Sequence, residues 1–113
     1  MLAEQSFEPR RFKISFEMFE ALSEAGHFGD KIVELLNGDI LVKGLQSDDH
    51  AYSIQNLTDI FYRYLGEQAT IRVQLPLVLE TPPPDFVVPD IALLELPKLQ
   101  YKTRTATDRK SVV

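Results

Sequence analysis

The sequence contains no cysteine, which excludes both a disulfide framework and a thiolate metal site. It has only two histidines, and their separation does not match zinc-ligand spacing. No apolar run approaches the roughly 20 residues needed to cross a bilayer, and the first residues lack a signal-peptide pattern, so we expect no membrane partner. A glycine-rich phosphate loop, a nucleophilic serine motif and internal repeats are also missing. We therefore expect no small-molecule cofactor and a reducing, cytoplasmic location.

Positive charge is also scarce. Twelve Lys and Arg against 17 Asp and Glu give a net charge of −5, which argues against a broad, non-specific nucleic-acid surface. The 113 residues, 44% of them hydrophobic, suffice for one domain with a modest core. We expect an irregular arm over residues 1–13, a core over residues 14–97 and a basic, flexible tail over residues 98–113.

Two amphipathic helices are indicated by capping residues and apolar spacing. Ser15 is a good N-cap for the first helix, and Gly26 is a natural stop. Ser47 can cap the second helix, which carries apolar residues at helical spacing and ends at Gly66.

Four apolar segments predict strands. Residues 32–36 and 39–42 flank Asn37-Gly38, a pair typical of the type I′ turn of a β-hairpin. The run over residues 70–79 predicts one strand, interrupted at an edge or bulge by Pro76. After a stiff loop over residues 81–85, the run beginning at Asp90 predicts the last strand. The sequence thus predicts an α+β fold with a mostly antiparallel sheet and flanking helices.

Three polar residues stand in apolar surroundings. Asp90 opens a buried strand, where a carboxylate is costly unless water, a metal or a donor satisfies it; it could also face solvent or cap the preceding loop. Glu34 is a lone acid among apolar hairpin residues, and an exposed position explains it equally well. His50 lies on the apolar stripe of the second helix, where a packed, hydrogen-bonded histidine is the common alternative to a ligand or base.

The order of these segments resembles the Uma2 family, endonucleases of the PD-(D/E)xK restriction-endonuclease-like superfamily. The hairpin over residues 33–40, the helix-opening His50 and the Pro-Asp strand over residues 89–94 carry the resemblance, which spans residues 14–96. It implies a restriction-endonuclease-like fold that acts on DNA with Mg²⁺ or Mn²⁺. Carried over, Glu34 is the first catalytic acid, Asp90 is the central metal ligand shared with Glu34, and His50 is auxiliary. Hard divalent cations prefer such carboxylate oxygens.

The chain departs from the family pattern after the Pro-Asp strand. The family has a second acid and a Lys on a neighbouring strand, whereas Glu95 and Lys98 follow Asp90 on the same one, and we assign neither a catalytic role. We therefore expect a truncated domain with weak or no activity. A missing strand beside the Asp90 strand would expose a sheet edge, which favours a homo-oligomer, most simply a dimer. The alternatives are a non-catalytic oligomeric remnant and a binding module that uses the basic tail.

Overall fold

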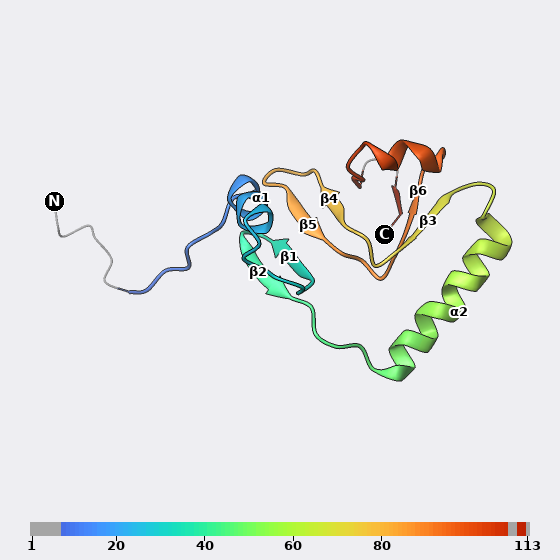
Figure 1. Ribbon diagram of the computed structural model, residues 1–113, viewed down its shortest axis with the longest axis horizontal. Coiled ribbons are helices and arrows are strands. Elements are labelled where there is room, and N and C mark those ends of the chain that lie inside the picture. Colours follow the sequence, from blue (N-terminus) through green and yellow to red (C-terminus); the bar gives the residue numbers. More distant parts are fainter. Residues whose placement is uncertain (1–7, 109–110, 113) are drawn as a thin grey trace.

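The structure is a computed structural model that describes residues 8–108 and the backbone of residues 111–112. It shows an α+β fold with two helices and two sheets (Figure 1). In chain order the elements are α1 (Phe16–Glu24), β1 (Val33–Leu36), β2 (Asp39–Val42), α2 (Asp48–Leu65), β3 (Thr70–Val73), β4 (Leu77–Leu79), β5 (Asp85–Val87), β6 (Ile91–Leu94), the 3₁₀ helix η2 (Lys98–Lys102) and β7 (Ser111–Val112).

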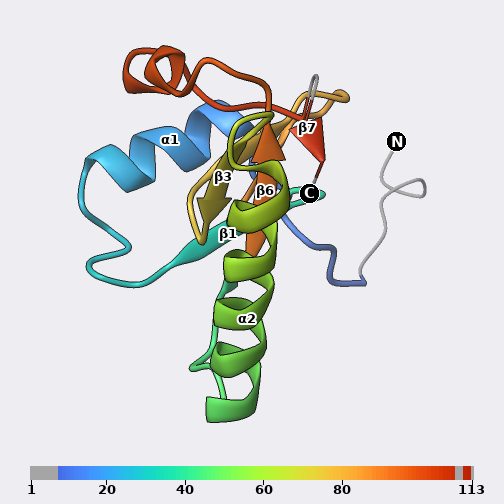
Figure 2. The same cartoon turned by 90° about the vertical axis from the view of Figure 1, so that its right-hand side faces the viewer.

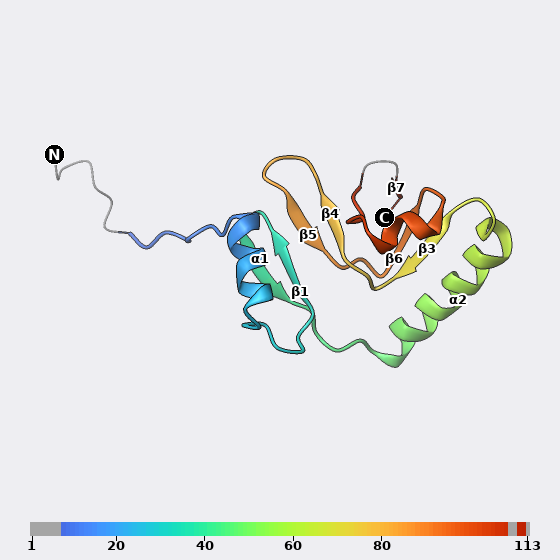
Figure 3. The same cartoon turned by 45° about the horizontal axis from the view of Figure 1, so that its top comes forward.

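The first sheet has the strand order β2-β1-β5-β4, and all its neighbouring strands are antiparallel. The predicted hairpin is confirmed, because Leu36 pairs with Asp39 and both turn residues, Asn37 and Gly38, have positive φ. Helix α1 lies along this sheet (Figure 3) and buries Phe19 against it. Ser15 caps α1 as predicted, because its hydroxyl accepts the backbone N–H of Met18 at 3.1 Å.

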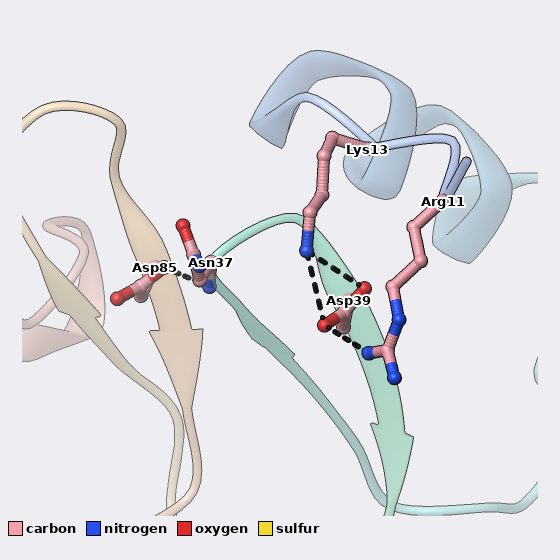
Figure 4. Close-up of polar contacts among 5 residues, drawn as sticks. All are labelled: Arg11, Lys13, Asn37, Asp39 and Asp85. Carbon is pink, nitrogen blue, oxygen red and sulfur yellow. Dashed lines mark hydrogen bonds and ion pairs between the residues drawn. The ribbon is translucent and has the colours of Figure 1, made fainter. Parts of the chain in front are cut away.

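The segment before α1 is attached to the hairpin (Figure 4). Arg11 and Lys13 each place a side-chain nitrogen 3.2 Å from a carboxylate oxygen of Asp39 on β2. The Lys13 hydrogen bond is the main cause that lowers the pKa of the Asp39 carboxyl, and the Arg11 guanidinium adds to it. On the other side of the turn, the N–H of Asn37 donates to Asp85 Oδ1 at 2.9 Å. Residues 11–13 therefore follow the first sheet although they form no helix or strand.

The run over residues 70–79 is two strands, so the prediction of one strand is wrong. Strand β3 belongs to the second sheet and β4 to the first. Gln74 separates them with a φ of +53°, and the chain turns from one sheet to the other over residues 74–76. The chain passes from the first sheet back to the second between β5 and β6, where the N–H of Gln74 donates to the carbonyl of Asp90 at 3.1 Å. These two connections, from β3 to β4 and from β5 to β6, meet at the base of the V formed by the strands in Figure 1.

The second sheet has the order β3-β6-β7, with β6 between two antiparallel neighbours. This corrects the expectation of an exposed edge on the Asp90 strand. A flexible tail was expected over residues 98–113, but residues 98–108 form η2 and then run along β4. There Ala106 is only 3% exposed, and its carbonyl accepts the N–H of Val78 at 3.0 Å. Ala106 of this segment belongs to the core cluster that contains Leu77 and Leu94, and Tyr101 packs against the same cluster.

Helix α2 lies in front of β3 and β6 in Figure 2. Ser47 caps it as predicted, and Gly66 ends it. Only Ile54 is buried among the residues of this helix. Tyr52, Leu57, Ile60, Tyr62 and Tyr64 are large side chains of α2 that stay largely exposed. Within the described residues, no helix is both long and apolar enough to span a membrane.

Candidate functional site

The short segment between β5 and β6, residues 88–90, contains the candidate Asp90 and is contacted by the other two candidates, Glu34 and His50. Glu34 comes from the middle of β1, and its Oε2 accepts the backbone N–H of Val88 at 2.8 Å across a separation of 54 residues. His50 comes from the first turn of α2, and its Nε2 lies 3.0 Å from Asp90 Oδ2. The structure therefore brings residues of a hairpin, a helix and the segment before β6 to one place.

The backbone of Asp90 is held in place by a hydrogen bond that does not involve its side chain. Its carbonyl accepts the N–H of Gln74, which ties it to the end of β3. The side chain is 39% exposed, so water reaches the carboxylate. The hydroxyl of Ser47 accepts the N–H of His50 at 3.2 Å, which holds the first turn of α2 and so directs the imidazole. The His50–Asp90 contact is an ion pair only when the imidazole is protonated.

A fourth residue, Lys43, joins this site and was not predicted. Its ammonium donates to the carbonyl of Val88 at 2.6 Å and lies 3.6 Å from Asp90 Oδ1. Its side chain is 27% exposed, less than those of Asp90 and His50. We use the name acid cluster for the four residues Glu34, Lys43, His50 and Asp90.

The signal for Lys43 lies in the hairpin register. The N–H of Lys43 donates to the carbonyl of Ile32 at 2.9 Å, which extends the ladder by one pair beyond β2. Because side chains alternate along a strand, this pairing puts Lys43 on the same face as Leu41, the partner of Glu34. Extending the predicted register by one pair would have placed Lys43 beside Glu34.

A cleft of about 390 Å³ adjoins the acid cluster. It shares Lys43 with the cluster, and Lys31, Gln46, Gln74 and the acidic Asp30 form other parts of its wall. Two ammonium groups outnumber the single carboxylate in this wall, which favours an anionic occupant, and the amides of the two glutamines can donate further hydrogen bonds. The cleft therefore has the chemistry to take a phosphate group next to Asp90.

The donors of the acid cluster fit a divalent cation in kind but not in number. Carboxylate oxygens and an imidazole are ligands that Mg²⁺ or Mn²⁺ accepts. Over residues 8–108, however, no group of three or more His, Asp or Glu side chains is close enough together to hold an ion. Both oxygens of Asp90 also face nitrogen atoms, of Lys43 and of His50. The cluster as it stands is an incomplete metal site.

Glu95 and Lys98 stay outside the acid cluster. The strand β6 separates both from Asp90, because Asp90 precedes this strand and they follow it. The carbonyl of Glu95 accepts the hydroxyl of Tyr101 at 2.6 Å, and Lys98 begins η2. This placement agrees with leaving both residues without a catalytic assignment.

No protein-family model matches this chain, and comparisons with curated proteins and with solved structures found no match either. The resemblance to the Uma2 family therefore stays a prediction.

Proposed function

We propose that this chain is a Uma2-like DNA endonuclease domain with a restriction-endonuclease-like fold, acting in the cytoplasm, and that its acid cluster is catalytically weak. The observation that carries the proposal is that Glu34 and His50 both contact the segment that contains Asp90: Glu34 accepts the N–H of Val88, and His50 lies against the Asp90 carboxylate. Glu34 and His50 lie 56 and 40 residues before Asp90 in the sequence, and chance does not favour the contact of both with the segment that contains it. The mostly antiparallel α+β architecture is compatible with this reading.

The proposed roles follow from the contacts. Asp90 and Glu34 offer carboxylate oxygens to Mg²⁺ or Mn²⁺, which when bound activates water and stabilises negative charge on a phosphoryl group. His50 orients the Asp90 carboxylate through the contact at Oδ2. Lys43 holds the carbonyl of Val88 and lines the neighbouring cleft, where its ammonium can hold a phosphate oxygen.

Weak activity follows from the number of ligands. Residues of a catalytic centre act as a unit, so the loss of one removes most of the rate enhancement. The acid cluster contains two carboxylates, and the family pattern requires a further acid and a Lys from another strand. We therefore expect slow nicking of DNA.

Nicking of supercoiled plasmid in Mn²⁺ tests the proposal. We expect slow nicking by the wild type, none by Asp90→Asn, and wild-type nicking by Asp59→Asn, which makes the same change on the exposed surface of α2. Equal nicking by Asp90→Asn, or nicking that persists in EDTA, would refute the assignment of Asp90.

A second candidate, a non-catalytic homodimer, is favoured by α2. Leu57, Ile60 and Tyr64 recur at helical spacing and are 46%, 47% and 69% exposed. A second copy could cover this stripe. Sedimentation of the wild type and of Leu57→Lys tests it, since a monomer at micromolar concentration contradicts the dimer.

A further inference from the structure

A second hollow, of about 810 Å³, lies between the C-terminal half of α2, β3 and η2. Its lining combines aliphatic side chains with two tyrosines, Tyr62 and Tyr101, and three cations, Arg72, Lys98 and Lys102. No carboxylate lines it among the described residues. In a chain with a net charge of −5, this is a local concentration of positive charge beside aromatic rings. We call it the tyrosine hollow.

The two tyrosines are presented differently. Tyr101 is fixed, because its hydroxyl donates to the carbonyl of Glu95 and the Arg72 guanidinium lies 5.9 Å from its ring centroid. Burial and the charge of Glu95 raise the pKa of Tyr101, which keeps its hydroxyl a donor. Tyr62 projects from α2 and is 55% exposed, so its ring is open to a ligand. Tyr101, which packs against the core and carries Arg72 over its ring, is a fixed wall of the hollow, and the open ring of Tyr62 suits the stacking of a flat group.

The cations do not converge on one point. The guanidinium of Arg72 already donates to the carbonyl of Pro76 at 3.0 Å. Lys98 and Lys102 are exposed at opposite ends of η2. The rise of a 3₁₀ helix separates their Cα atoms by about 8 Å along its axis. That separation is about twice the charge spacing along a stacked nucleic-acid strand. A small anion would require donors gathered around it, whereas spaced cations beside aromatic rings fit a nucleic-acid backbone.

We propose that the tyrosine hollow binds single-stranded DNA, with a base stacked on Tyr62 and phosphates held by Lys98 and Lys102. This rests on the proposed nuclease function and specifies its substrate as DNA with an unpaired segment. Tyr62 follows His50 by twelve residues along α2, about 18 Å at the rise of an α-helix. Since His50 contacts Asp90, a strand of a few nucleotides would connect the hollow with the acid cluster.

Fluorescence anisotropy of a labelled ten-nucleotide oligothymidylate, measured in EDTA, tests this site. We expect the wild type to bind the oligonucleotide more tightly than a duplex of the same length. Tyr62→Ala should bind about ten-fold more weakly because a base loses its stacking partner, and Tyr62→Phe should bind like the wild type. Lys102→Glu should weaken binding and reduce the slope of log affinity against log salt by about 0.7.

The matched control is Arg63→Glu, which makes the same charge change on α2 outside the lining of the hollow. Its binding should stay within about two-fold of the wild type, because it loses no phosphate contact. Circular dichroism melts establish that each variant is folded. Equal affinity of wild type and folded Tyr62→Ala, equal affinity for duplex, no binding by the wild type, or equal losses in Arg63→Glu and Lys102→Glu would each overturn the proposal.

The EDTA condition separates this proposal from the nuclease assignment. Asp90→Asn should bind the oligonucleotide like the wild type, because the acid cluster lies outside the hollow. Absence of nicking with tyrosine-dependent binding intact would refute the nuclease assignment alone. Nicking that needs Asp90 but is unchanged in Tyr62→Ala, together with unchanged binding, would refute the hollow alone.

Discussion

Replacement of Glu34 by Ala should measurably destabilise the protein, independently of any chemistry. The Glu34 carboxylate accepts the N–H of Val88 at 2.8 Å, and Val88 is only 5% exposed. The alanine variant leaves this N–H without its acceptor, which costs about 2 kcal/mol of unfolding free energy. In a domain of this size the midpoint of thermal unfolding should fall by roughly 10 °C.

Urea denaturation of the wild type, Glu34→Ala and Glu34→Gln measures this cost. Glutamine keeps an acceptor oxygen at the same reach, so it should lose about half as much stability as alanine. The matched control is Glu17→Ala, which removes an exposed carboxylate from the first turn of α1 and should cost less than about 1 kcal/mol. A Glu34→Ala protein as stable as the wild type would show that the Glu34–Val88 contact does not hold the site together.

Three other changes have expected outcomes. Gly38→Ala should cost about 1–3 kcal/mol in urea denaturation, because Gly38 has a φ of +78° and a Cβ there would lie 2.9 Å from the Lys13 side chain. The pKa of Asp39 is lowered in the folded state, so its stabilisation is present above the ordinary value of 3.8 and is lost as the pH falls through the folded-state pKa. Asp39→Asn should therefore flatten the acid limb of a plot of stability against pH. Thr70→Val should stabilise the protein by about 1 kcal/mol in the same urea assay, because the buried hydroxyl of Thr70 has no partner among the described residues.

A specific result would contradict each of these three predictions. A Gly38→Ala variant with wild-type stability would mean that the hairpin tolerates a side chain at its turn. An unchanged acid limb in Asp39→Asn would show that the contacts in Figure 4 do not hold the carboxylate charged. A less stable Thr70→Val would reveal a partner for the hydroxyl.

Local signals predicted the parts of the fold that depend on a few adjacent residues. Asn37-Gly38 determined the hairpin register because few other pairs adopt two consecutive positive φ angles. Both helix starts followed from capping serines, whose side chains accept backbone N–H groups as expected.

The errors arose where distant segments decide the outcome. The run over residues 70–79 alternates like one strand, and only the positive φ of Gln74 divides it between two sheets. Nothing periodic marks residues 98–108, yet Ala106 is buried because β4 offers it backbone partners. Long-range pairing of this kind leaves no pattern in the paired segment itself.

Two acids of the site were predicted from the sequence, and Lys43 was missed. Asp90 and Glu34 stood out because a charge in an apolar run needs a partner, and each has one. Lys43 escaped notice because it follows the hairpin and has no unusual neighbours in the sequence. Its role depends on the return of residues 88–90 to the hairpin, which the sequence pattern does not encode.

Calorimetric titration of Mn²⁺ into the wild type and Asp90→Ala tests whether the acid cluster binds a divalent cation. We expect weak binding of Mn²⁺ to the wild type and loss of that binding in Asp90→Ala, with Asp59→Asn binding like the wild type. Mn²⁺ binding that is equal in wild type and Asp90→Ala, or absent from the wild type, would contradict a cation site at the acid cluster.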